Sequence, residues 1–195
     1  MPEMGRAAKA FCTSAPYQAL ARRVLVPRAL QGEQPRGEVL EIGTGSGAMA
    51  AQILAAFPDA RLVATDYDPD MVTTATGNLA RFGDRARVER ADATALPFED
   101  GRFDLVLSFA MLHHVVKWED ALGEAVRVLR PGGRLVGYDL LASPAFRFMH
   151  HREHSEVRMM RLEELEQELP RLALTEVQLR RTALGLIVKF RATRA

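Results

Sequence analysis

The stretch Val39-Leu40-Glu41-Ile42-Gly43-Thr44-Gly45-Ser46-Gly47 decides the fold of this chain. Its apolar first half predicts a buried strand, and three glycines at alternate positions follow. A helical pattern then runs over Ala48–Phe57 and ends at Pro58. Glycine has no Cβ, so the backbone can turn tightly and approach a ligand closely. In an open parallel sheet, ligands bind beyond the carboxyl ends of the strands. The stretch therefore predicts a loop that binds a nucleotide or nucleoside cofactor, with a simple tight turn as the alternative.

The spacing of the glycines narrows the choice of cofactor. The pattern is G-x-G-x-G, and Ala48 follows Gly47, whereas dinucleotide sites usually have G-x-G-x-x-G. No Gly-Lys-Ser/Thr sequence follows, which argues against a Walker phosphate loop. A nicotinamide-dependent oxidoreductase therefore remains only as the weaker alternative.

Apolar runs alternate with helical stretches along the rest of the chain. Strands are predicted at Arg61–Thr65, Ala86–Arg90, Phe103–Ser108 and Arg134–Leu140, and helices at Pro69–Phe82 and Glu119–Leu129. Helices between strands imply right-handed crossovers and a mainly parallel sheet with helices on both faces. Alternation over Leu172–Thr182 and Leu184–Arg194 predicts a closing antiparallel hairpin. The expected fold class is α/β, a Rossmann-like, doubly wound sheet of seven strands.

Composition limits the possible partners. The chain has 195 residues, 48% of them hydrophobic, and a formal net charge of +1. This length and hydrophobic content predict a folded chain of single-domain size. The near-zero net charge gives no general attraction to nucleic acid or to a membrane surface. The single cysteine, Cys12, cannot form an internal disulfide, and uncharged runs such as Leu105–Leu112 are too short to span a bilayer. We expect a cytoplasmic protein with no membrane or nucleic-acid partner; the sequence does not indicate its oligomeric state.

Two acidic residues follow predicted strands on the same rim as the glycine loop. Asp66 ends the second strand and could accept hydrogen bonds from both ribose hydroxyls of a cofactor. Asp92 follows the third strand and could accept a hydrogen bond from an adenine amino group. Each is also compatible with an ordinary solvated turn.

Taken together, these segments resemble the class I S-adenosylmethionine-dependent methyltransferases, particularly the UbiE-like (methyltransferase type 11) group that acts on small molecules. The resemblance covers roughly residues 37–141. The matching segments are Leu40–Gly47, Asp66–Met71, Ala91–Ala93 leading to Leu96–Phe98, Phe103–Ser108, Leu112–Val115 and Arg127–Gly133. It implies S-adenosylmethionine as the cofactor, and a last, antiparallel strand inserted inside the sheet edge.

On the methionine side of that cofactor, the resemblance implies a set of contacts around the glycine loop. Glu41 and the backbone of Gly43, Thr44, Gly45 and Gly47 would surround the methionine moiety.

The resemblance implies five further residues in contact with the cofactor. Asp66 would hold the ribose, Tyr67 would lie against the adenine, and Asp92 with the backbone of Ala93 would bind the adenine edge. Ser108, which closes the fourth strand, would offer its carbonyl to the amino group of the cofactor.

Two histidines follow the fourth strand, where the transferred methyl group is expected. The sulfonium of the cofactor makes this methyl group electrophilic, so the protein mainly supplies proximity and orientation. These can lower the activation barrier by ~7–11 kcal/mol. Imidazole titrates near neutral pH and suits general-base catalysis. His114, or alternatively His113, is the candidate catalytic base; packing under the next helix is the other interpretation.

A second histidine cluster, His150, His151 and His154, has two members at helical i, i+4 spacing. It lacks a third predicted ligand and a supporting shell, so we expect no metal site there, but a substrate contact or a polar helix face.

The segment after the fourth strand, Ser108-Phe109-Ala110-Met111, lacks the Asn/Asp-Pro-Pro-aromatic motif of base methylases, which again argues against a nucleic-acid substrate.

We expect one domain in four parts: a helical cap (1–36), a cofactor-binding core (37–141), an acceptor-side segment (142–171) and the closing hairpin (172–195). A non-catalytic, methyltransferase-like binding protein is the other alternative.

Overall fold

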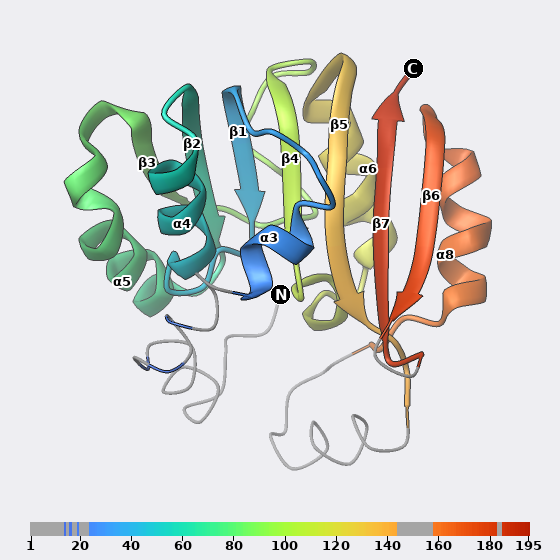
Figure 1. The fold of residues 1–195 in the computed structure, drawn as a ribbon. Helices are drawn as coiled ribbons and strands as arrows, with labels where there is room; N and C mark the ends of the chain where they lie inside the picture. Colours follow the sequence, from blue (N-terminus) through green and yellow to red (C-terminus); the bar gives the residue numbers. More distant parts are fainter. Residues whose placement is uncertain (1–13, 15, 17–18, 20–23, 144–157, 183–184) are drawn as a thin grey trace.

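The computed structural model describes residues 14, 16, 19, 24–143, 158–182 and 185–195, and its centre is one seven-stranded sheet (Figure 1). The strands lie in the order β3-β2-β1-β4-β5-β7-β6. Their bounds are β1 Gly37–Ile42, β2 Ala60–Asp66, β3 Ala86–Arg90, β4 Phe103–Phe109, β5 Leu129–Leu140, β6 Leu174–Thr182 and β7 Ile187–Arg194. This confirms the predicted α/β fold with a mainly parallel, doubly wound sheet.

The closing hairpin adopts the arrangement that the family resemblance implies. Strand β7 pairs antiparallel with β5 on one side and with β6 on the other, so the last strand lies inside the sheet edge. Both hairpin strands are shorter than the sequence predicts, because Leu172 follows a 3₁₀ turn (η4, Leu169–Arg171) and β7 begins at Ile187.

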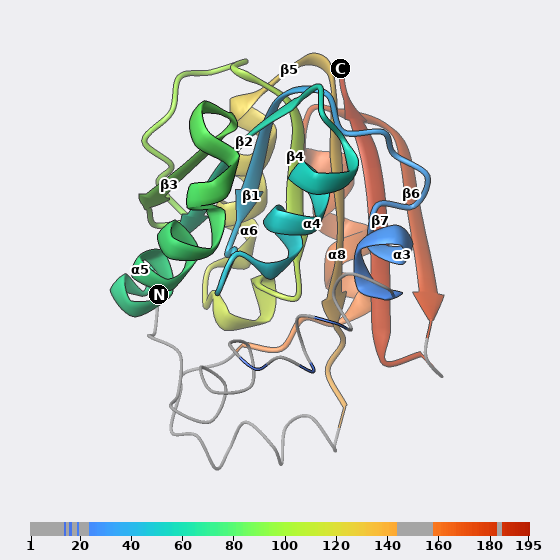
Figure 2. The same cartoon turned by 60° about the vertical axis from the view of Figure 1, so that its left-hand side comes forward.

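Helices cover both faces of the sheet (Figures 1 and 2). One face carries α3 (Val26–Ala29), α4 (Ala48–Ala56) and α5 (Pro69–Leu79), and the other carries α6 (Trp118–Val128) and α8 (Leu162–Glu168). Successive residues of β4 pack into different clusters: Leu105 and Leu107 pack with α4, and Val106 packs with α6. Strands buried on both faces read as continuous apolar runs, which is why the central strands were predictable.

The helix expected at Pro69–Phe82 is shorter than predicted. α5 ends at Leu79, and the chain tightens into a 3₁₀ segment (η2, Ala80–Arg85). Gly83 within it has φ 56°, a conformation that interrupts a right-handed helix.

Strand β5 begins earlier than predicted. Leu129 already pairs with Phe103, while Arg134 pairs with Leu105, so the register shifts between these two pairs. The Pro131-Gly132-Gly133 turn is therefore accommodated as an irregularity within the strand, not as a break before it.

Parts of the outer segments lie outside the described residues. Of the expected cap (1–36), the structure describes mainly α3 and the connection to β1; of the acceptor-side segment (142–171), it describes mainly α8 and η4. His150, His151 and His154 lie outside the described residues. Among the helices that are described, none is both long and apolar enough to cross a membrane.

Candidate functional site

The glycine loop joins β1 to α4 at the edge where β1, β2, β4 and β5 end (Figure 1). Gly43, Gly45 and Gly47 all have positive φ, at 71°, 55° and 76°. A Cβ on Gly43 would overlap the side chain of Met111, and one on Gly47 would lie 3.2 Å from the Cβ of Ala75. A Cβ on Gly45 would meet nothing within 4 Å. Packing therefore excludes a side chain at Gly43 and leaves little room for one at Gly47, whereas Gly45 faces open space into which a ligand can come close.

Backbone and side-chain hydrogen bonds hold this loop in place. The Thr44 amide donates to the Thr65 carbonyl at 2.9 Å, which ties the loop to the end of β2. Asn78 of α5 donates its side-chain amide to the Ser46 carbonyl at 2.8 Å. Sequence reasoning missed Asn78, because nothing in an isolated helical asparagine indicates which loop it reaches. The loop shape is therefore largely present without a ligand.

Two carboxylates lie beside the loop. Glu41, at the end of β1, is only 2% exposed, and Thr44 Oγ1 donates to its Oε2 at 2.6 Å. Burial raises the pKa of Glu41 to about 7; the Thr44 hydrogen bond opposes this rise and the charge of Asp66 adds to it.

Asp66 is held toward the same loop. Its Oδ2 accepts the Gly45 N–H at 2.8 Å, and its Oδ1 accepts the Asp68 N–H at 3.0 Å. Burial raises the pKa of Asp66 as well, against these backbone hydrogen bonds. Within the part of the chain that the structure describes, neither Glu41 nor Asp66 pairs with a basic side chain. One buried and one half-buried acid without a basic partner fit a ligand that brings positive charge, and S-adenosylmethionine carries both a sulfonium and an ammonium group.

The remaining predicted cofactor residues lie at the ends of neighbouring strands. Tyr67 is half-buried, and the guanidinium carbon of Arg90 lies 5.3 Å from its ring centroid. Asp92 Oδ1 accepts hydrogen bonds from the backbone and hydroxyl of Thr94. Burial acts to raise the pKa of Asp92, but the bonds from Thr94 outweigh it, and the pKa is lowered. Ala93 is buried beside it.

Ser108 occupies the end of β4, opposite Ile42 of β1 and Gly137 of β5. It is buried, and its hydroxyl has no hydrogen-bond partner within the described structure. A buried polar atom left unpaired costs free energy, so this hydroxyl marks the strand end as a place where a polar ligand would be favourable.

The two histidines follow β4 in a 3₁₀ turn (η3, Leu112–His114), and the structure separates their surroundings. His113 is 3% exposed, with Nδ1 2.6 Å from Asp139 Oδ1. His114 is half-buried, and its ring centroid lies 4.0 Å from that of His113. Met111 precedes this turn, and its side chain occupies the space in which a Cβ on Gly43 would lie. The turn therefore adjoins the glycine loop.

Asp139, at the end of β5, is a site residue that sequence reasoning missed. Its side chain is fully buried; besides contacting His113, it accepts the Leu112 N–H at 2.7 Å and the Leu140 N–H at 2.6 Å. The available signal was an acid near the end of the predicted strand Arg134–Leu140. The carboxylate joins the end of β5 to the turn after β4, and so fixes how His113 is oriented.

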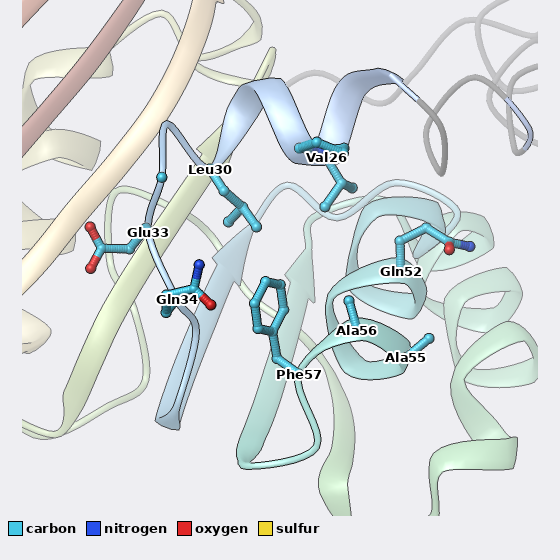
Figure 3. A pocket seen from close by; sticks show the side chains of 10 residues that line it. Val26, Leu30, Glu33, Gln34, Gln52, Ala55, Ala56 and Phe57 are labelled. Carbon is cyan, nitrogen blue, oxygen red and sulfur yellow. The ribbon is translucent and has the colours of Figure 1, made fainter.

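A cavity of about 500 Å³ lies elsewhere, between α3, α4 and the connection to β1 (Figure 3). Val26, Leu30, Ala56 and Phe57 are among its lining residues, and none of the predicted cofactor residues contributes to it. It is therefore separate from the site described above. No cluster of three or more potential metal ligands occurs among the residues that the structure describes.

The family described as "Methyltransferase domain" matches residues 40–137, half of this chain. The chain belongs to this methyltransferase family. Membership confirms the predicted UbiE-like class I methyltransferase and S-adenosylmethionine as its cofactor. It does not favour the nicotinamide or non-catalytic alternatives.

Curated relatives share the central part of the chain. A demethylmenaquinone methyltransferase of Thermus thermophilus is 40% identical over 115 residues, which cover 59% of this chain and 51% of the relative. A malonyl-[acyl-carrier protein] O-methyltransferase of Geobacter sulfurreducens is 34% identical over 136 residues, 67% of this chain and 49% of the relative. The chain thus spans about half the length of the curated relatives it matches.

Solved structures share the fold over nearly the whole chain. A putative methyltransferase solved in complex with the Haloferax volcanii Trm112 activator has a TM-score of 0.78 at 18% identity, covering 96% of this chain and 94% of that one. The YcgJ protein of Bacillus subtilis has a TM-score of 0.71 at 20% identity, covering 90% and 98%.

Proposed function

We propose that this chain transfers the methyl group of S-adenosylmethionine to a small-molecule acceptor. The observation that carries the proposal is a pair of carboxylates beside the glycine loop, buried Glu41 and half-buried Asp66, which have no basic partner among the described residues. A cationic cofactor complements this charge.

Residues at the methionine side are proposed to hold the charged end of the cofactor. Glu41, together with the backbone of Gly43, Thr44, Gly45 and Gly47, would surround the methionine moiety. The cofactor supplies an electrophilic methyl group, and the role of these residues is to orient it and to exclude water.

Residues at the adenosine side are proposed to fix its position. The Asp66 carboxylate accepts the Gly45 and Asp68 N–H groups and keeps further acceptor capacity for ribose hydroxyls. Tyr67, Asp92 and Ala93 would bind the adenine. Separately, the carbonyl of Ser108 would accept a hydrogen bond from the cofactor's amino group.

The histidine turn is proposed to serve the acceptor. His114 is the more exposed of the pair and is the preferred general base. His113 is the alternative; its hydrogen bond to Asp139 fixes its tautomer and ring orientation, as a carboxylate partner commonly does.

The acceptor class is proposed from the relatives and from the sequence. Several curated relatives are named demethylmenaquinone methyltransferases, so a demethylmenaquinone-type acceptor is the first to test. We also propose that residues 1–36 and 142–171 border the acceptor side, and that the protein works in the cytoplasm without a nucleic-acid or membrane partner.

Formation of S-adenosylhomocysteine by the full chain, with a demethylmenaquinone analogue as acceptor, tests the function. We expect His114→Ala and His113→Ala to lower turnover while cofactor affinity, measured by calorimetry, changes little. Full turnover in both variants would contradict the base assignment. Tight cofactor binding without turnover of any acceptor would instead favour the non-catalytic alternative.

A further inference from the structure

The hairpin of β6 and β7 carries a basic hollow on the face away from α8. Val188 and Phe190 of β7 pack in the core cluster that includes α8, so the alternate residues Lys189 and Arg191 point to the opposite face. There a hollow of about 300 Å³ opens between the hairpin and α3. Its lining residues are Arg28, Gln31, Gln178, Arg180, Thr182, Lys189 and Arg191.

Hydrogen bonds hold one wall of this hollow in a fixed shape. Gln31, with φ 53°, donates its side-chain amide to the Gly137 and Phe190 carbonyls at 3.1 and 3.0 Å, and so fastens the end of α3 to β5 and β7. Lys189 Nζ donates to the Arg28 carbonyl at 2.8 Å. These groups are therefore positioned before any ligand arrives, which lowers the entropic cost of binding.

The charge of the hollow is poorly balanced. Arg180 lies directly opposite Lys189 in the β6–β7 register, and like charges in directly opposite positions destabilise a sheet. In the described parts of the chain, Arg28, Arg180 and Lys189 form no ion pair with a carboxylate. Arg191 alone has one, at 3.8 Å from Glu33.

The other face of the same strand provides a contrast. Arg181, the next residue along β6, lies 3.7 Å from Glu163 of α8 and so has an acidic neighbour. The imbalance is therefore a property of the hollow and not of β6 as a whole, and a bound anion would relieve it.

We propose that this hollow binds a phosphoryl group, at a site separate from the cofactor site. None of the ten predicted cofactor residues lines it. Guanidinium groups match phosphate oxygens with two parallel hydrogen bonds, and an ammonium adds a compact point charge. The Gln178 amide and the Thr182 hydroxyl are additional donors for a group that has several acceptor oxygens and close to two negative charges.

Calorimetry and thermal unfolding of the full chain test this proposal with inorganic phosphate as the probe. Sodium chloride at equal ionic strength is the reference, and saturating S-adenosylhomocysteine keeps the probe out of the cofactor site. The variant is Arg180→Gln, and the control is Arg181→Gln, which makes the same change on the opposite face of β6. We expect phosphate to raise the unfolding temperature of the wild type and of Arg181→Gln, and Arg180→Gln to bind it about tenfold more weakly or worse.

The readout does not depend on methyl transfer, so the proposal and the proposed function can fail separately. A phosphate effect no larger than that of chloride, or equal phosphate affinity in Arg180→Gln and wild type, would overturn it. Glycerol 3-phosphate identifies the source of the phosphoryl group: tighter binding than phosphate indicates a phosphorylated organic ligand, and equal or weaker binding indicates free phosphate.

In chloride alone, Arg180→Gln should be at least as stable as the wild type, because it removes a like-charge contact. A clear loss of stability there would make Arg180 a structural residue and would contradict the proposal.

Discussion

Replacing Glu41 with glutamine should remove a pH dependence from cofactor binding. Burial raises the pKa of Glu41 to about 7 in the ligand-free chain, so much of this side chain is protonated below neutral pH. A cationic ligand favours the carboxylate, and the proton must then leave when S-adenosylmethionine binds. Glutamine keeps the size of the side chain and its capacity to accept the Thr44 hydrogen bond, but it cannot titrate.

The size of the effect follows from the two pKa values. If binding returns Glu41 to its ordinary pKa, affinity should fall about tenfold between pH 8 and pH 6, since each pKa unit corresponds to roughly 1.4 kcal/mol. Calorimetry in buffers of different ionisation enthalpy should show up to about one proton released per cofactor bound near pH 6. Glu41→Gln should release correspondingly fewer protons and bind with a flatter pH profile.

Two controls isolate the role of Glu41. Glu38→Gln makes the same change on the same strand at a half-exposed position, and the ionisation of the cofactor itself is common to all variants. In the ligand-free chain, the raised pKa of folded Glu41 means that its own contribution to stability is greatest below about pH 4.5 and is lost as pH rises through 7, by up to about 3 kcal/mol. Glu41→Gln should lack this loss in urea denaturation. Identical pH profiles of binding and stability for wild type and Glu41→Gln would refute the reasoning.

Three further predictions follow from the geometry of the cofactor site and from the hydrogen bonds of Arg127. Asp66→Ala should weaken cofactor binding by about 1–3 kcal/mol in calorimetry, while Asp59→Ala, at an exposed position, should leave it unchanged. Gly45→Ala should abolish cofactor binding but cost only about 1 kcal/mol of stability, because the added Cβ enters open space. Gly43→Ala should lower the unfolding temperature substantially, because its Cβ would overlap Met111, and a larger loss of stability in Gly45→Ala than in Gly43→Ala would contradict the assigned roles. Arg127→Ala should cost about 1–3 kcal/mol of stability in urea denaturation, because it removes hydrogen bonds to Glu124, Asp100 and two backbone carbonyls. An unchanged denaturation midpoint would show that this network contributes little.

Sequence patterns could predict the sheet because its strands are short, apolar and separated by helices. The glycine loop was equally predictable, since alternating glycines after a strand have few other structural explanations. Asp66 could be located because it ends a strand, and the carboxyl ends of parallel strands share one edge.

Contacts between segments distant in the sequence could not be predicted. Asp139 is 26 residues from His113, and only the pairing of β4 with β5 brings the two together. The basic hollow depends on α3 lying against β7, with Lys189 161 residues from Arg28. Local patterns carry no information on such pairs, which explains why the histidines were identified while the carboxylate that orients one of them was not.

Calorimetric titration of the full chain with S-adenosylhomocysteine and, separately, with NAD tests the central claim most directly. The geometry of Glu41, Gly45 and Asp66 predicts saturable binding of S-adenosylhomocysteine with one molecule per chain, weakened by Asp66→Ala, and no comparable heat with NAD. Tight NAD binding with no signal from S-adenosylhomocysteine would contradict the account.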